Sequence, residues 1–208
     1  MKAIGLTSGK LSVDQCVTAG SARDLRRMLA CAAIANVAMI AASYVAIPIG
    51  AVPVTLQTFA LMIICTSFGI GGAVGVSAWF AEACFGAPVT ALGYGGLLGL
   101  AGGYIVGQAL SALICCWAVE RGFGRVGSLP VRAVSSGALI VLMELLVFSF
   151  GVVWLTAFGM SLRHAVFVGV MPFLIAELVK AAAAAPCIPL ARRAVGTAVQ
   201  PRRLAGAP

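Results

Sequence analysis

The sequence predicts an all-α integral membrane protein that crosses the bilayer six times. Hydrophobic residues make up 62% of its 208 positions and charged residues only 10%, which is far from the balance of a soluble domain. The apolar runs are continuous and do not alternate between inward and outward positions, which argues against a β-barrel. At roughly 20 residues per spanning helix, the length suits one domain of about six spans with short loops.

The expected elements follow from the apolar runs and the polar residues between them. In chain order they are a polar leader at 1–27, spans at about 28–47, 55–68, 70–86, 97–118, 133–158 and 165–190 within a membrane domain of residues 28–193, and a tail at 194–208. In the first span, the spacing of Ala38 and Ala42 lets another helix approach closely, either from the same protein or from a partner. Pro48 and Pro53 bracket an uncharged connection to the second span.

Two glycine-rich stretches follow in the middle of the chain. The segment 86–96 is too flexible for a helix interior and too apolar for an ordinary solvated loop. We therefore expect a lid or a re-entrant segment over a cavity there. The fourth span contains Gly99, Gly102, Gly103 and Gly107, which predicts close packing against a neighbouring helix.

The basic residues predict how the protein is oriented. Five lie in the leader, three between positions 121 and 132, and four after position 190, whereas Arg163 stands alone on the opposite side of a six-span arrangement. The positive-inside rule then places both termini in the cytoplasm. The net charge of +8 is explained by this asymmetry, so we expect no nucleic-acid partner. The connection 48–53 and the segment 86–96 would both face outward.

Four ionisable side chains fall inside the expected spans: Glu82, Glu144, Glu177 and Lys180. Such groups are expensive in lipid and normally face a protein interior or a ligand cavity. Glu177 and Lys180 are three residues apart, so on a helix they share a face. They could form a mutual ion pair that only fixes packing, but together they could also hold a small, partly polar solute, with Lys180 meeting a carboxylate or carbonyl.

Other function classes find less support in the sequence. The lone His164 lacks an evident nucleophile partner, and no phosphate loop with a Gly-Lys-Ser or Gly-Lys-Thr signature occurs, so neither catalysis nor ATP hydrolysis by this chain is expected. The seven cysteines are scattered without zinc-site spacing, and neither a metal site nor a resident cofactor is expected. A stand-alone proton-coupled carrier that uses Glu82, Glu144 and Glu177 remains an alternative.

Four motifs follow one another along the membrane domain: residues 48–58 (PIGAVPVTLQT), 86–89 (GAPV), 97–104 (LLGLAGGY) and 169–173 (GVMPF) with Lys180. In this order they resemble the PVPxTLQT segment, the GLPVF turn, the LLGPTGGY segment and the GVLPFxxGDxxK segment of the BioY family, the biotin-binding S components of energy-coupling factor (ECF) transporters. The TLQT segment is the strongest single piece.

The resemblance implies a six-helix S component in the plasma membrane of a prokaryote, with both termini cytoplasmic. It implies that biotin is captured from outside and that an alanine-rich first helix, with Ala38 and Ala42, docks on a transmembrane coupling subunit. Two cytoplasmic ATPase subunits would supply the energy. Lys180 and Glu177 match the lysine and the acid that contact biotin in the family.

Some positions depart from the family pattern. Ala176-Glu177 stand where the family has Gly-Asp, so the acid is one methylene longer, and Leu100-Ala101 replace Pro-Thr. An S component for another vitamin-like solute is therefore a second alternative. The expected substrate-binding residues are Lys180, Glu177, Gln57, Tyr94 and Glu82, although Gln57 could instead satisfy backbone groups near a helix start and Tyr94 could be an interfacial anchor.

Overall fold

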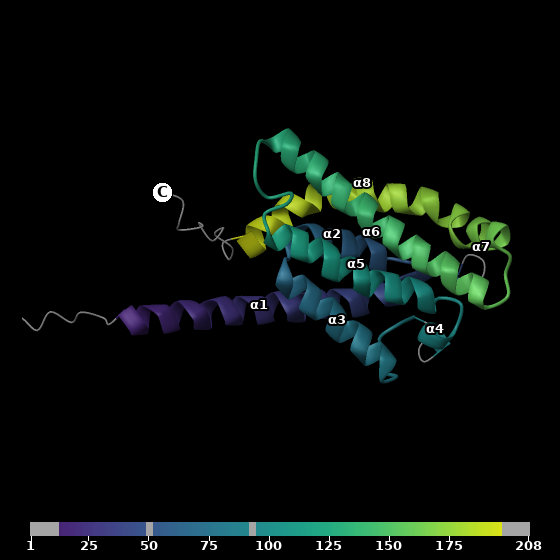
Figure 1. Cartoon of the computed structure of the whole chain (residues 1–208), viewed down its shortest axis with the longest axis horizontal. Helices are drawn as coiled ribbons and strands as arrows, with labels where there is room; N and C mark the ends of the chain where they lie inside the picture. Colours follow the sequence, from purple (N-terminus) through teal and green to yellow (C-terminus); the bar gives the residue numbers. More distant parts are fainter. Residues whose placement is uncertain (1–12, 49–51, 92–94, 197–208) are drawn as a thin grey trace, which may run out of the picture.

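The computed structural model describes residues 13–48, 52–91 and 95–196, which form a bundle of helices (Figure 1). Two short strands pair within it. The helices are α1 Val13–Tyr44, α2 Gln57–Ser67, α3 Ile70–Cys84, α4 Gly95–Leu98, α5 Gly102–Glu120, α6 Leu129–Ala157, α7 Leu162–Gly169 and α8 Met171–Gly196, and the strands are β1 Ala46–Ile47 and β2 Val54–Thr55. The N-terminal part of α1 extends beyond the bundle, while the other long helices lie along one another.

The structure is mostly helical, as the sequence predicts, but the expected spans differ in length. Among the described residues, four helical stretches are long and apolar enough to cross a membrane: Asp24–Tyr44, Gly102–Glu120, Leu129–Ala157 and Leu162–Val195. The expected second and third spans are shorter apolar helices, α2 with 11 residues and α3 with 15. Helix α1 begins at Val13, inside the predicted leader, whereas most of the predicted tail lies outside the described residues.

Helix α2 is short because the chain before it is extended. Residues Ala46 and Ile47 pair antiparallel with Thr55 and Val54, and the Leu56 amide donates to the Val45 carbonyl at 3.0 Å. Proline at position 53 cannot donate to a backbone ladder and suits such an extended connection. The backbone therefore turns into a helix only at Gln57, in the interior of the bundle.

Small residues bring α1 and α3 into close contact. A Cβ atom placed on Gly75 would lie 2.2 Å from the Ala32 carbonyl oxygen, and one on Gly71 would lie 2.7 Å from Cys31 Cβ. These two glycines are one helical turn apart on α3, so they form a small-xxx-small face. Ala38 and Ala42 are half-buried on α1 and are not among the residues that these glycines meet.

The predicted packing surface of the fourth span is also confirmed. A Cβ on Gly103 would lie 2.2 Å from Trp154 Cβ, and one on Gly107 would lie 2.8 Å from Val147 Cα. Helices α5 and α6 therefore approach each other closely along these glycines. Packed this way, they support one wall of the cavity described below.

The described part of the segment 86–96 is tied to the bundle by side chains. The Val89 carbonyl accepts hydrogen bonds from Trp79 Nε1 and from Ser43 Oγ, both at 3.0 Å, and the Tyr44 hydroxyl donates to the Pro88 carbonyl. These bonds come from α3 and α1. They fix the backbone just before Thr90, which faces the cavity.

Candidate functional site

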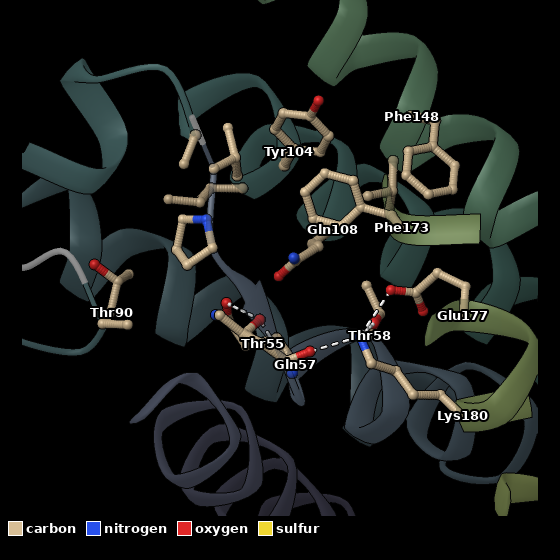
Figure 2. Close-up of a pocket in the computed structure, with 16 residues that line it drawn as sticks. Thr55, Gln57, Thr58, Thr90, Tyr104, Gln108, Phe148, Phe173, Glu177 and Lys180 are labelled. Carbon is tan, nitrogen blue, oxygen red and sulfur yellow. Dashed lines mark hydrogen bonds and ion pairs between the residues drawn. The ribbon is translucent and has the colours of Figure 1, made fainter. Parts of the chain in front are cut away.

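An internal cavity lies where the short helix α2 meets α5, α6 and α8 (Figure 2). Its volume is about 60 Å³. The lining residues come from the extended connection, from the segment before α4 and from the four helices: Val52, Pro53, Thr55, Gln57, Thr58, Thr90, Ala91, Ala101, Tyr104, Ile105, Gln108, Val147, Phe148, Phe173, Glu177 and Lys180. Apolar walls with a few convergent polar groups are typical of a small-molecule site.

Lys180 is the most heavily bonded side chain of the cavity. Its ammonium donates to Glu177 Oε1 at 2.7 Å, to Thr58 Oγ1 at 2.8 Å and to the Thr55 carbonyl at 2.6 Å. An ammonium has three N–H donors, so all of them are engaged. The Thr55 carbonyl belongs to the extended connection, and only an extended backbone leaves it free of helical hydrogen bonds. Lys180 therefore ties α8 to the start of α2.

Glu177 keeps one oxygen available to a ligand. Its Oε1 pairs with Lys180, whereas Oε2 is buried and has no hydrogen-bond partner among the described residues. Both side chains of the pair are buried, with an exposed fraction of 7% for each residue. A buried carboxylate oxygen without a donor is costly, so a ligand N–H group at this place would be strongly favoured.

Glu144 lies near this pair from helix α6. Its carboxyl is close enough to Glu177 and Lys180 to interact with both charges. Both of its oxygens are buried and receive no hydrogen bond from a donor group of the described residues, and the carboxyl lies within hydrogen-bonding distance of that of Glu177. Glu177 and Lys180 thus line the cavity, and the carboxyl of Glu144 lies close to them without being part of the lining.

Two side-chain amides complete the polar lining. Gln57 accepts a hydrogen bond from Thr55 Oγ1 at 3.0 Å through Oε1, while its Nε2 is buried without a partner among the described residues. Gln108, on α5, has an equally buried and unpartnered Oε1 in the part of the chain described. In Figure 2 the Gln108 amide and Gln57 both approach the space beside Thr55. An amide can present either its NH₂ or its oxygen, so the two residues can meet a donor or an acceptor.

Aromatic rings form another part of the lining. The rings of Tyr104 and Phe173 stack with centroids 6.0 Å apart, and Phe148 is tilted against Phe173 at 6.2 Å. The Tyr104 hydroxyl donates to the Gly169 carbonyl at 2.8 Å. A Cβ on Gly169 would lie 2.4 Å from that hydroxyl, so only glycine fits at the break between α7 and α8.

The structure brings together three of the five expected binding residues. Lys180, Glu177 and Gln57 line the cavity. Glu82 lies apart from it, where Oε1 accepts from Asn36 Nδ2 at 3.1 Å and links α3 to α1. Tyr94 lies outside the described residues.

Sequence reasoning missed Gln108, Tyr104 and Phe173 as lining residues. Gln108 had a detectable signal, since an uncharged amide in the middle of an apolar span normally faces a polar interior. Tyr104 and Phe173 lie within quoted motifs, but nothing in their spacing shows that the two rings meet.

A second hollow on the surface is lined by Ser161, Arg163, His164, Val166, Phe167 and Met171. It is more open, and Arg163, His164, Phe167 and Met171 are exposed. No lining atom of this hollow is among the buried unpartnered polar atoms of the described residues. The internal cavity is therefore the better candidate for specific binding.

Comparisons with known proteins agree with this architecture. A model described as the BioY family matches residues 12–197. The protein named Biotin transporter BioY from Thermotoga maritima is 28% identical over 165 residues, which cover 76% of this chain and 92% of the relative. The crystal structure at 2.1 Å of the S-component for biotin from an ECF-type ABC transporter aligns with a TM-score of 0.64 and 22% identity over 88% of this chain and 94% of the other. That alignment shows a common fold.

Proposed function

The chain belongs to the BioY family, as its motifs predicted, and on this premise we propose that it is the biotin-capture S subunit of an ECF-type importer. The observation that carries the proposal is the set of buried, unpartnered polar atoms around one apolar cavity: Gln57 Nε2, Gln108 Oε1 and Glu177 Oε2. The names of the relative from Thermotoga maritima and of the structurally similar protein both specify biotin. Biotin would be transported cargo, and no resident cofactor is proposed.

Biotin's ureido group fits this set chemically. It has one carbonyl oxygen between two N–H donors. Gln57 Nε2 would donate to the carbonyl, while Glu177 Oε2 and Gln108 Oε1 would each accept from an N–H. The stacked rings of Tyr104 and Phe173 would hold the apolar part of the ligand. Lys180 would act mainly on Glu177, because its three donors are already engaged.

The cavity must expand to admit such a ligand. Its volume of about 60 Å³ is well below the roughly 300–1,000 Å³ of ordinary ligand pockets. The lining residues Val52, Pro53, Thr90 and Ala91 belong to connections rather than to long helices, so they could move without displacing a long helix. We propose that these two connections face outward and open for the ligand.

We further propose six crossings, with both termini in the cytoplasm of a prokaryote and the protein in its plasma membrane. Helix α2, at about 1.5 Å per residue, covers only about half of a hydrocarbon core of roughly 30 Å. The paired segments Ala46–Ile47 and Val54–Thr55 that precede it would help to complete the crossing where protein covers the backbone. The excess of basic residues at one end supports the orientation.

Helix α1 supplies a surface for the coupling subunit in this proposal. Ala33, Val37 and Ala41 are exposed at successive helical turns, and Ala38 and Ala42 lie half-buried beside them. Small side chains at this spacing allow a partner helix to approach closely. The partner would be an ECF transmembrane coupling subunit that is joined to two ATPase subunits.

Uptake in cells tests the proposal. A bacterial strain unable to make or import biotin would be supplied with this chain, with and without a coupling subunit and its two ATPases. The proposal predicts growth on low external biotin with the complete set. If the same set of subunits failed to restore growth on low biotin but restored the growth of a thiamine- or riboflavin-limited strain, the result would support an S component for another vitamin-like solute. It would overturn the biotin assignment.

The adjacent carboxyls favour one alternative, a stand-alone proton-coupled carrier. Glu144 and Glu177 lie near each other in the middle of the bundle, as proton-coupling groups often do. Proteoliposomes containing only this chain separate the two functions. Biotin accumulation driven by an imposed pH gradient would support the carrier. If the same proteoliposomes bind biotin but do not accumulate it, the result supports the capture subunit.

A further inference from the structure

Two arginines bond to the C-terminal end of α2, and a third, Arg132, lies within electrostatic reach of one of them. Arg192 of α8 donates to the Thr66 carbonyl through Nε at 3.0 Å and Nη2 at 2.8 Å, and Nη2 also donates to Ser136 Oγ at 2.9 Å. Arg125, from the loop after α5, donates to the Ser67 carbonyl. These last carbonyls of α2 would otherwise lack helical partners, so two of the arginines cap the helix.

The third arginine, Arg132, does not cap the helix. Its Nε is buried, and among the described residues its guanidinium makes neither a hydrogen bond nor an ion pair. The charges of Arg132 and Arg125 both act on Arg192, so the three guanidinium groups lie within electrostatic reach of one another. Three like charges in one place are unfavourable unless an anion joins them.

Near the cluster, the residues that the structure describes offer too little negative charge to balance it. The C-terminus of α2 contributes about half an elementary charge. Glu120 is the nearby acid, but its Oε2 accepts from the Ile70 amide at 3.2 Å, at the N-terminus of α3. Burial lowers the pKa of Arg125, while the charge of Glu120 acts in the opposite direction. An external anion would relieve the remaining repulsion.

The surroundings of the cluster indicate which kind of anion. Arg121 lies over the ring of Trp117 at 3.9 Å, at the end of α5, and an exposed tryptophan is typical of the membrane interface. Beside the arginines, Val126, Leu129 and Val134 are 65%, 78% and 73% exposed. A soluble phosphate gains nothing from such apolar neighbours, whereas acyl chains do.

We propose that Arg125, Arg132 and Arg192 bind the phosphate of an anionic phospholipid, whose acyl chains lie along Leu129 and Val134. Bidentate guanidinium contacts suit a phosphate group, and Arg132 has its donors available for them. The lipid would bridge the first turn of α6 to the end of α8. It would thereby support the helix ends at this face of the protein.

Lipid retention and thermal stability test the site. Purified full-length protein would be placed in nanodiscs of phosphatidylcholine with or without phosphatidylglycerol, and bound lipid would be counted by native mass spectrometry. Arg132→Gln removes the unbonded guanidinium, and Arg193→Gln removes an exposed one from the same end as a matched control. Phosphatidylglycerol is expected to raise the melting temperature of the wild type and the control, with about tenfold weaker retention in Arg132→Gln.

Three results would overturn the proposal. Equal phosphatidylglycerol retention by the two variants would show that Arg132 is not part of a lipid site. Equal stabilisation by inorganic phosphate in detergent would assign the cluster to a soluble anion. Unchanged lipid binding with impaired assembly of the coupling subunit would assign it to a protein partner. Arg132→Lys, which keeps the charge but loses the bidentate fork, is expected to retain phosphatidylglycerol at a level between those of the wild type and Arg132→Gln.

Discussion

Replacing Lys180 with methionine removes the ammonium that joins α8 to α2 and keeps a side chain of similar length. Three acceptors then lose their donor: Glu177 Oε1, Thr58 Oγ1 and the Thr55 carbonyl. Glu177 would be left with neither carboxylate oxygen paired, because Oε2 already has no partner among the described residues. The variant therefore isolates what the ammonium does.

The expected size of the effect follows from this geometry. Breaking a buried ion pair by removing one partner costs about 3–5 kcal/mol of folding stability, and both residues here are only 7% exposed. Without the ammonium, Glu177 is no longer held in place as an acceptor, so binding should lose about 1.5–3 kcal/mol, or roughly 10- to 150-fold in affinity.

Two further variants separate stability from binding. Glu177→Gln removes the negative charge and keeps the shape, and the double variant Lys180→Met/Glu177→Gln removes the whole pair. Because a missing pair is cheaper than a broken one, the double variant should recover most of the stability lost in Lys180→Met. It should not recover biotin affinity, since the ionised Glu177 acceptor is absent.

Calorimetric titration with biotin and thermal unfolding in the same detergent would measure both quantities. Arg163→Gln, an exposed charge removed outside the cavity, serves as the matched control. Unchanged biotin affinity in Lys180→Met, or wild-type affinity in the double variant, would show that the pair is structural only. The assigned role of Glu177 would then be wrong.

The remaining predictions concern the amides and the helix contacts. Gln57→Leu and Gln108→Leu should each weaken biotin binding about 5- to 150-fold in calorimetry, because each removes a buried amide atom that lacks a partner among the described residues. Gln108→Leu should leave the melting temperature nearly unchanged, whereas Gln57→Leu should lower it slightly, since Gln57 Oε1 also accepts from Thr55 Oγ1. A large loss of stability with unaltered affinity would contradict this. Gly75→Ala should lower the melting temperature strongly, since its Cβ would lie 2.2 Å from the Ala32 carbonyl oxygen. Gly137→Ala, with nothing within 4 Å, should be neutral or raise it, and equal effects of the two substitutions would refute the proposed α1–α3 contact.

Much of the membrane architecture was predictable from local sequence. Continuous apolar runs located the helices, and the spacing of Glu177 and Lys180 placed both on one face of α8. The glycines of α5 indicated a close helix contact before any partner was known. These features depend on residues a few positions apart, which is why the sequence alone reveals them.

Other features depend on residues distant in sequence and could not be predicted. The Lys180 ammonium donates to Thr55 and Thr58, which lie 125 and 122 positions away in the sequence. Only the fold therefore shows that all of its N–H donors are engaged. The Tyr104 hydroxyl similarly explains the break at Gly169 across 65 positions. On α1, small residues occur on several faces, and burial alone separates the exposed Ala33 and Ala41 from the half-buried Ala38.

A structure of the protein with biotin bound would test the central claim most directly. The account predicts the ureido group in the internal cavity, with its N–H groups within hydrogen-bond distance of Glu177 Oε2 and Gln108 and its carbonyl near Gln57 Nε2. It also predicts that Lys180 keeps its contact with Glu177. Biotin seated elsewhere, for example in the surface hollow beside His164, or bound through a Lys180 that has left Glu177, would contradict the account.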